Sequence, residues 1–197
     1  MNVTKLVEDI VILHQNSIEN WYAESVNVNS DGLLKVIAEN HAFNFKLWQA
    51  EDRARREDKG FEFVYLAKRE IDSCNQQRNN KMEEIDGLLY NVLCPAPVAE
   101  CKVNSETPGM IIDRLSILSL KFYHMRLQGN RKDVSTLHRD TCIQKSQVIA
   151  SQKEQLGKCL SELLQEIIAK TRTFRVYHQF KMYNDPALNP ELYKSLS

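Results

Sequence analysis

Polar side chains that could hold a ligand recur at helical spacing in two neighbouring segments of the chain. His41, Trp48, Asp52 and Arg55 follow one another at intervals of seven, four and three residues, which places them on one face of a helix. In the next segment Arg78 lies close to an apolar stripe, and the polar residues beside it are Lys68, Asp72, Asn75 and Asn79. Arginine and amide groups bind hydroxyl and phosphate oxygens, so these faces predict a site for a small anionic or sugar-like ligand.

Two other interpretations of the same faces stay open. A polar helix face is often simply solvated, although each Asn in such a face costs about 0.5 kcal/mol relative to Ala, which favours partners for these side chains. The faces could instead form a structural network inside the protein. Because a buried charge needs a partner, such a network predicts that Arg55 and Arg78 pair with carboxylates such as Asp52 or Asp72.

A helix start at Thr107-Pro108-Gly109 adds a candidate anion site. Threonine is a good N-cap residue, and proline is favoured at the first helical position. The free backbone N–H groups of such a start can hold a phosphate or carboxylate, and Asp113 and Arg114 follow on the same helix. The commoner outcome is a helix that is capped by its own side chain, and both interpretations are kept.

Carboxylates in the same region support a second hypothesis, a metal-dependent hydrolase that acts on nucleotides or phosphoesters. Its residues would be Asp52, Asp72, Glu83 and Asp86. Glu83-x-x-Asp86 supplies one of the two acidic motifs with which all-α nucleotide pyrophosphatases hold Mg²⁺, but no Glu-x-x-Glu precedes it. No metal site and no cofactor are therefore predicted, and the sequence leaves open whether the protein is an enzyme.

The composition argues against several classes of partner. The 26 basic and 26 acidic residues give a formal net charge of zero, so we expect neither nucleic-acid binding nor attraction to an anionic membrane surface. No run of about 18 apolar residues occurs, which argues against a membrane span. The N-terminal residues do not resemble a secretory signal, and the five scattered cysteines are typical of a reducing compartment. A cytoplasmic location is expected.

Apolar periodicity predicts the elements that position these side chains. Residues at i, i+3, i+4 and i+7 indicate helices over 4–22, 32–58, 61–93, 107–128 and 133–171. Two prolines after residue 93 end the third helix and begin a long loop. We predict an all-α fold: an antiparallel bundle of about five long helices, forming a single domain over 1–197 without convincing strands.

The C-terminal residues 172–197 are expected to form an irregular tail docked on the bundle. Turns are predicted over 183–190, where proline, asparagine and aspartate are frequent. The aromatic side chains expected to anchor this tail are Phe174, Tyr177, Phe180 and Tyr183.

Four motifs in order carry a resemblance to a known family. They are LWQAEDRAR at 47–55, KREIDSCNQQRN at 68–79, ETPGMIIDRLSIL at 106–118 and KMYNDPALNP at 181–190. Together they resemble the bacterial domain-of-unknown-function family 4254, over about residues 21–193. The resemblance implies a helical protein with no assigned reaction and, through the family's gene neighbourhoods, a link to surface-polysaccharide glycosyltransferases. Asn80 stands where the family has an aspartate, which removes a carboxylate from any metal site there.

Three functional hypotheses follow. The first is an accessory protein that binds a small anionic or sugar-like ligand through His41, Trp48, Asp52, Arg55, Lys68, Asp72, Asn75, Arg78, Asn79, Asp113 and Arg114. The second is the metal-dependent hydrolase. The third is a structural or assembly protein, whose half-polar fifth helix would serve as a contact surface for a homo-oligomer.

Overall fold

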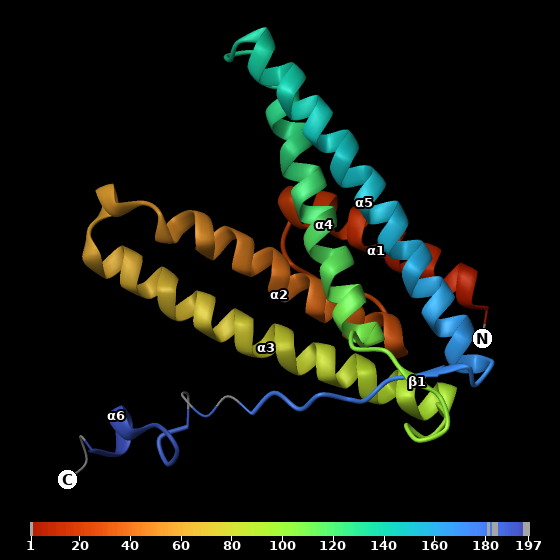
Figure 1. The fold of residues 1–197 in the computed structure, drawn as a ribbon. Helices are drawn as coiled ribbons and strands as arrows, with labels where there is room; N and C mark the ends of the chain where they lie inside the picture. Colours follow the sequence, from red (N-terminus) through yellow and green to blue (C-terminus); the bar gives the residue numbers. More distant parts are fainter. Residues whose placement is uncertain (1, 181, 183–184, 195–197) are drawn as a thin grey trace.

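Five long helices make up most of the molecule (Figure 1). The computed structural model describes residues 2–180, 182 and 185–194. The long helices are α1 (Val3–Ala23), α2 (Gly32–Ala54), α3 (Phe61–Leu93), α4 (Pro108–Gly129) and α5 (Thr136–Ile168). The predicted all-α fold class is confirmed.

Two of the helices are shorter than predicted. A separate 3₁₀ helix, η1 (Glu57–Lys59), takes up the residues expected at the end of α2, and Gly60 then turns the chain with a φ of 89°. α5 begins later than predicted because Ser135 caps it, its hydroxyl oxygen accepting a hydrogen bond from the backbone N–H of His138 at 3.2 Å. The same helix ends at Ile168 rather than at residue 171.

The long helices form two antiparallel hairpins that cross one another (Figure 1). α2 packs along α3, and α4 packs along α5. Contacts between the hairpins are made chiefly by α4, which lies against both α2 and α3. α1 lies behind the crossing and contacts α2, α4 and α5. The antiparallel arrangement therefore holds within each hairpin, whereas the two hairpins run in different directions.

The hydrophobic core lies where the hairpins cross. Every long helix contributes at least one side chain with no exposed surface, namely Ile10, Ile37, Ile85, Leu115 and Leu164. Burial of apolar surface stabilises a fold by about 25 cal/mol per Å². The crossing is therefore the part of the molecule that can hold side chains in a fixed geometry.

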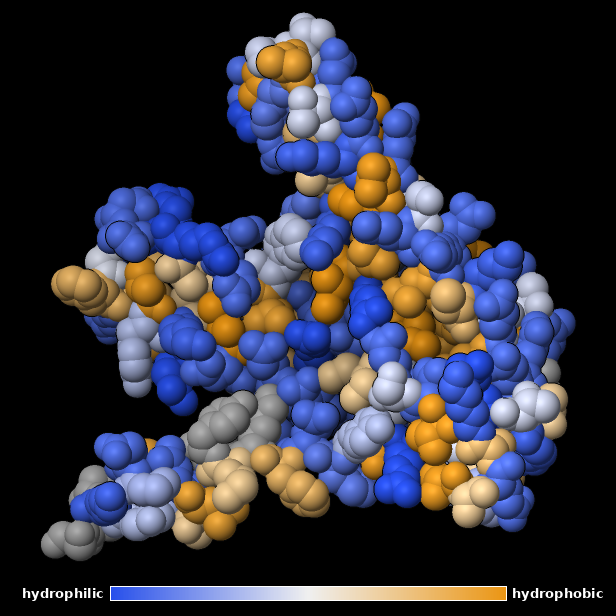
Figure 2. Space-filling model, in the orientation of Figure 1, coloured by the Kyte–Doolittle hydropathy of each residue, from blue (hydrophilic) through white to orange (hydrophobic). Residues whose placement is uncertain are grey.

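The outer parts of the hairpins are more polar. In the space-filling view, the outer end of the α4–α5 hairpin stands clear of the body and is covered mostly by hydrophilic residues (Figure 2). This end includes the thinly apolar first half of α5. Within the described residues, no helix combines the length and the apolar character needed to cross a membrane.

A two-stranded contact, which was not predicted, fastens the start of the tail. β1 (Lys102–Val103), in the loop after α3, pairs in parallel with β2 (Arg172–Thr173), which follows α5. The backbone N–H of Asn104 extends the pairing by donating to the carbonyl of Thr173 at 2.7 Å. Both strands have only two residues, too few to show the alternating pattern by which strands are found in a sequence.

Of the three predicted aromatic anchors that lie in the described residues, one is buried. Phe174 has 1% of its surface exposed, whereas Tyr177 and Phe180 are exposed and Tyr183 lies outside the described residues. Further on, the four-residue helix α6 (Pro190–Tyr193) replaces part of the predicted irregular tail. The tail is therefore docked on the body at its start, through β2 and Phe174, and again at His178 and Gln179, which both bond to Glu83 of α3.

Candidate ligand-binding site

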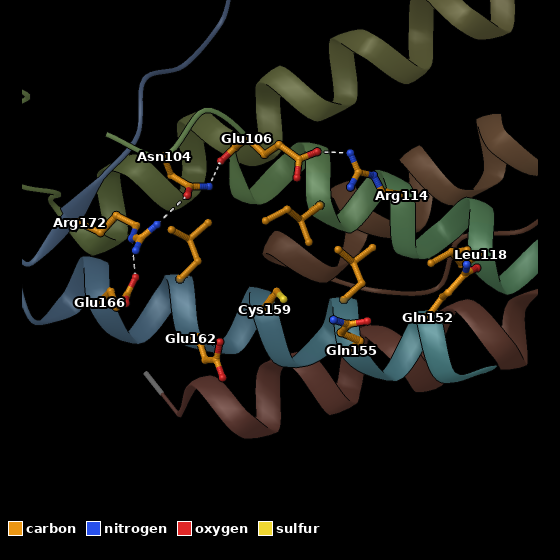
Figure 3. Close-up of a pocket in the computed structure, with 13 residues that line it drawn as sticks. Asn104, Glu106, Arg114, Leu118, Gln152, Gln155, Cys159, Glu162, Glu166 and Arg172 are labelled. Atoms are coloured by element: carbon orange, nitrogen blue, oxygen red, sulfur yellow. Dashed lines mark hydrogen bonds and ion pairs between the residues drawn. The ribbon is translucent and has the colours of Figure 1, made fainter. Parts of the chain in front are cut away.

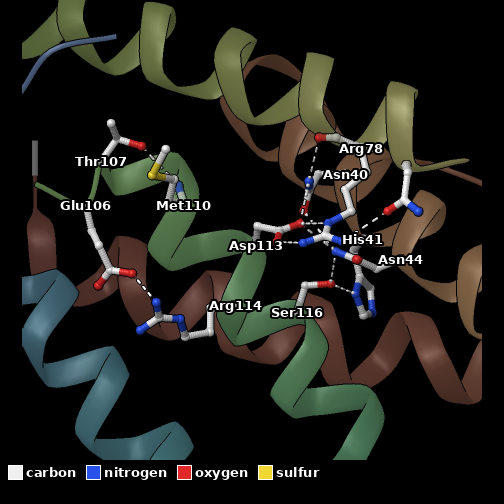
Figure 4. Close-up of polar contacts among 11 residues, drawn as sticks. Asn40, His41, Asn44, Arg78, Glu106, Thr107, Met110, Asp113, Arg114 and Ser116 are labelled. Atoms are coloured by element: carbon white, nitrogen blue, oxygen red, sulfur yellow. Dashed lines mark hydrogen bonds and ion pairs between the residues drawn. The ribbon is translucent and has the colours of Figure 1, made fainter. Parts of the chain in front are cut away.

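A buried ion pair joins the two hairpins (Figure 4). Arg78 of α3 donates two hydrogen bonds to Asp113 of α4, from Nε to Oδ1 at 2.9 Å and from Nη2 to Oδ2 at 2.7 Å. Asp113 is 3% exposed, so its charge must be balanced inside the protein. Asn40 and Asn44 of α2 donate to the same Oδ1, at 3.1 and 2.9 Å. The carboxylate is thus held by N–H groups from two helices.

A chain of hydrogen bonds leads from this ion pair to His41 (Figure 4) and from there to α1. The side-chain amide of Asn44 donates to Oγ of Ser116 at 3.0 Å, and the Ser116 hydroxyl lies 2.6 Å from Nδ1 of His41. Nε2 of His41 lies 2.9 Å from the backbone carbonyl of His14. Because a carbonyl only accepts, Nε2 carries the proton of the neutral ring and Nδ1 accepts from Ser116. Burial lowers the pKa of His41 to about 3, so the ring stays neutral.

These six residues, Asn40, His41, Asn44, Arg78, Asp113 and Ser116, form what we call the polar cluster. Three of them, Asn40, Asn44 and Ser116, were not among the predicted site residues. Their signal in the sequence is a polar i, i+4 pair on the buried face of α2 and a polar i, i+3 pair, Asp113 and Ser116, in the apolar stretch of α4. Buried polar groups need partners, so such pairs predict contacts between helices.

His14 is buried beside the polar cluster without partners of its own. Neither of its ring nitrogens has a hydrogen-bond partner among the described residues. Its ring centroid lies 4.5 Å from that of His41. Burial, followed by the nearby His41 and Lys153, lowers the pKa of His14 well below its usual value. A neutral imidazole still carries one N–H, which destabilises the fold when it is buried unpaired.

A pocket of about 360 Å³ lies next to the polar cluster, between α2, α3 and α4. Two members of the cluster, Asn44 and Arg78, belong to its lining. The lining residues are Asn44, Leu47, Trp48, Glu51, Asp52, Arg55, Arg78, Ile117 and Leu120. The structure therefore brings four predicted site residues, Trp48, Asp52, Arg55 and Arg78, to one pocket, with His41 and Asp113 in the polar cluster beside it.

Trp48 is held in the pocket wall by a stack of aromatic side chains. Its ring lies parallel to that of His124 on α4, with centroids 4.4 Å apart and an interplanar angle of 6°. The hydroxyl of Tyr22 hydrogen-bonds to Nε2 of His124 at 3.1 Å, and the Tyr22 ring stacks on Tyr123 at 5.2 Å. Burial lowers the pKa of His124, against the opposing effect of Asp52. Contacts from α1 and α4 therefore hold the ring of Trp48, which lines the pocket, in a fixed orientation.

The charges of the pocket are paired differently from the prediction. Both arginines pair with carboxylates, as a network predicts, but the partners are Asp113 for Arg78 and Glu51, at 2.7 Å, for Arg55 rather than Asp52 or Asp72. The sequence could not show this, because Asp113 lies 35 residues beyond Arg78 on another helix. Asp52 makes no ion pair with any described residue. Among the described residues, the charge in this pocket without an ion-pair partner is therefore the negative charge of Asp52.

The outer part of α3 does not contribute to this pocket. Lys68 and Asp72 form an exposed ion pair with each other at 2.7 Å. Asn75 accepts only a long hydrogen bond, 3.4 Å, from Nη1 of Arg78, and Asn79 is half-buried one turn further on. The polar face that the sequence suggested on α3 thus separates into a surface part, with Lys68 and Asp72, and Arg78, which reaches α4.

Arg114 faces a different pocket, of about 610 Å³, between α4 and α5 (Figure 3). It forms an ion pair with Glu106. The second arginine of this pocket, Arg172, pairs with Glu166 and donates to the side chain of Asn104 at 3.1 Å. Both arginines are therefore already neutralised, and Arg114 is not brought together with the other predicted residues.

The start of α4 is occupied by a carboxylate of the chain itself. Oδ1 of Asp86, on α3, accepts a hydrogen bond from the backbone N–H of Gly109 at 2.7 Å, and the Thr107 hydroxyl also bonds to this carboxylate. The same hydroxyl oxygen caps the helix by accepting from the N–H of Met110 at 3.2 Å. The capped interpretation therefore holds, and Asp86 takes the place considered for an external anion. Burial raises the pKa of Asp86 to about 6.

We expect Gly109→Ala to destabilise the protein by about 3 kcal/mol through overpacking. A Cβ at Gly109 would lie 2.6 Å from the carbonyl oxygen of Met82 and 2.8 Å from Oδ1 of Asp86, so α3 and α4 would have to separate. Urea denaturation measures the loss. Gly87→Ala is the matched control, because nothing lies within 4 Å of its Cβ, and it should be neutral or slightly stabilising. Equal stabilities of the two variants would contradict the close contact.

The four carboxylates of the hydrolase hypothesis lie in different places and have different partners. Asp72 pairs with Lys68, Glu83 pairs with His178, and Asp86 caps α4, while Asp52 lines the pocket. Across the part of the chain that the structure describes, no group of three or more His, Cys, Asp or Glu side chains could hold a metal ion. These four residues therefore do not form one acidic site.

The fold and the site define an all-helical protein in which a buried arginine–aspartate pair joins two hairpins beside a small pocket. The chain belongs to the family described as "Protein of unknown function (DUF4254)", which matches residues 34–176 and confirms the resemblance seen in the motifs. The fourth motif lies beyond this match, and its residues Lys181, Tyr183 and Asn184 lie outside the described residues. No curated protein and no solved structure matches the chain.

Proposed function

We propose that the protein binds a small, uncharged, hydroxyl-rich ligand of the sugar type in the pocket between α2, α3 and α4. The observation that carries this proposal is the position of Arg78. Its guanidinium is fixed by two hydrogen bonds to the buried Asp113, and it lines the same pocket as Trp48. A rigid donor beside a flat aromatic wall suits a ring that carries hydroxyl groups.

The hydrogen-bonding capacity of the pocket supports this choice of ligand. A guanidinium has five N–H groups, of which Asp113 takes two and Asn75 takes one through the long contact. The others have no partner among the described residues and remain for a ligand hydroxyl. The Asp52 carboxylate accepts hydrogen bonds from hydroxyl donors. The volume of about 360 Å³ falls within the usual range of ligand pockets.

The charges favour a neutral ligand over an anionic one. Arg55 and Arg78 are each paired with a carboxylate, and Asp52 adds a negative charge without an ion-pair partner in the described chain. A phosphate would meet repulsion from Asp52. We therefore retain the sugar-like part of the original prediction rather than the anionic part. An accessory role beside surface-polysaccharide synthesis is compatible with such a ligand.

Calorimetric titration with glucose, N-acetylglucosamine and glucose 1-phosphate tests the proposal. We expect a neutral sugar to bind more tightly than the sugar phosphate. Asp52→Asn should weaken its binding about tenfold, because hydrogen bonds to charged groups contribute about 1.5–3 kcal/mol. Asp140→Asn, at an exposed position of α5, is the matched control and should leave binding unchanged. Binding of the phosphate alone, improved by Asp52→Asn, would contradict the proposal, as would the absence of binding by any of these sugars.

A further inference from the structure

A second, mostly apolar groove lies between α1 and α5, with a volume of about 660 Å³. It is separate from the pocket that Trp48 lines, since the two have no lining residue in common. Its apolar lining consists of Val7, Val11, Ile12, Phe122, Ala150 and Gly157. The α1 lining runs from residue 4 to residue 15, about 16 Å at 1.5 Å per residue, so the groove is elongated along the helices.

One cation, Lys153, lies within this apolar lining. Lys153 is half-buried, and its Nζ lies 5.6 Å from the centroid of the Phe122 ring. It forms no ion pair with any residue in the described part of the chain, and burial lowers its pKa. The other charged residues of the groove, Glu8, Glu154 and Lys158, are exposed to solvent. A half-buried charge without an ion-pair partner is costly, and an anion placed beside it recovers much of that cost.

The floor of the groove is kept open by a glycine. A Cβ at Gly157 would touch only Cγ1 of Val7, at an ordinary distance of 3.7 Å. A larger residue at this position would therefore extend into the groove rather than into a packed neighbour. His14 lies near Lys153, but burial keeps its ring neutral, so it does not neutralise the lysine. A ligand can therefore contact both the apolar lining along the groove and the charged group of Lys153.

We propose that this groove binds a medium-chain carboxylate, with the carboxylate at Lys153 and the alkyl chain along Val7, Val11 and Gly157. The apolar lining suits the chain, and Lys153 selects the charge of the head group. This inference does not depend on the proposed sugar site, because the two sites use different residues.

Calorimetric titration of the full chain with decanoate, below the concentration at which it forms micelles, tests the proposal. Decanol and decyltrimethylammonium keep the chain and remove or reverse the charge, and we expect both to bind at least tenfold more weakly than decanoate. Lys153→Met should weaken decanoate binding at least tenfold and leave decanol binding unchanged. Lys158→Met, at an exposed position of the same groove, is the matched control. Equal binding of the three probes, or full decanoate affinity in Lys153→Met, would overturn the proposal.

A second pair of variants tests the location without changing charge. Gly157→Leu should block the groove and abolish binding of decanoate and decanol, whereas Gly157→Ala should fold normally and keep most of it. Circular dichroism checks that each variant is folded.

Sedimentation of the free protein tests the other possible occupant of the groove, a second copy of this chain. A dimer that dissociates only in Gly157→Leu would show that the groove is an interface and overturn the proposal.

Discussion

Asp113→Ala is expected to lower the free energy of unfolding by about 3–5 kcal/mol, the largest loss from a single substitution that this structure predicts. Asp113 is 3% exposed, and its carboxylate holds Arg78 through two hydrogen bonds. Without it, the guanidinium keeps its charge in a largely enclosed position, and the amides of Asn40 and Asn44 also lose their acceptor. The cost arises mainly from the groups left behind.

Urea denaturation of a double-mutant cycle measures this effect. Arg78→Ala should also be strongly destabilising, because it leaves the Asp113 carboxylate buried without its counter-charge. The double variant should cost clearly less than the sum of the two single losses, since neither unpaired charge then remains. Asp140→Ala, on the exposed surface of α5, should have little effect. Additive losses in the cycle would show that Arg78 and Asp113 do not depend on each other.

Acid should destabilise the protein from about pH 6.5 downward through its two buried histidines. The pKa of His41 falls from 6.5 to about 3 on folding, and the pKa of His14 is also well below 6.5. Below pH 6.5 the unfolded chain binds protons that the folded chain cannot. The stabilising contribution is therefore complete above pH 6.5 and is lost as the pH falls towards 3. His41, whose pKa falls to about 3, should cost about 2 kcal/mol at pH 5, and His14 adds to this loss in the same direction.

Asp86 opposes this trend over part of the range. Its pKa is raised from 3.8 to about 6, so the folded chain binds a proton more readily than the unfolded chain. Its contribution to stability is greatest below pH 3.8 and is lost as the pH rises through 6. Between pH 6 and pH 5 it offsets about 1 kcal/mol of the loss from the histidines. The net effect of acid remains destabilising, because two histidines act against one carboxyl group.

His14→Leu should separate these contributions. At pH 7 the variant should be more stable than the wild type by about 1–3 kcal/mol, because it removes an imidazole without a described partner from the core. Its advantage should grow between pH 7 and pH 5, since one of the two titrating histidines is gone. Denaturant unfolding at several pH values measures both. The exposed His138→Leu is the control, and pH profiles parallel to the wild type in His14→Leu would refute the assignment.

The helices could be predicted from the sequence because their signals are local. Apolar residues at helical spacing, the Pro95 and Pro97 pair and the Thr107-Pro108 start all act within a few residues of the boundaries they determine. The crossing of the two hairpins could not be predicted in this way. It depends on how the side chains of α4 fit against α2 and α3, and spacing along one helix carries no information about that fit.

The candidate site was predicted in part for the same reason. Trp48 and Asp52 were found because they share one helix face, and both line the pocket. Arg78 was recognised as an inward charge, but its partner Asp113 is on another helix and was assigned elsewhere. Lys68 was grouped with them only by its position on α3, and the structure places it at the surface. Periodicity identifies a face of a helix, whereas the neighbouring helices decide which part of that face is covered.

The crossing of the hairpins also has a mechanical consequence. α3 and α5 have 33 residues each, about 50 Å of helix, while the contacts between the hairpins are made chiefly by α4, which carries Asp113 of the Arg78–Asp113 pair. Each hairpin therefore extends far beyond its contact with the other hairpin, and this contact lies beside the pocket lined by Trp48. A small rotation of one hairpin against the other would move the outer ends of the helices much further than the pocket. A ligand that caused such a rotation would therefore produce its largest displacement at those ends.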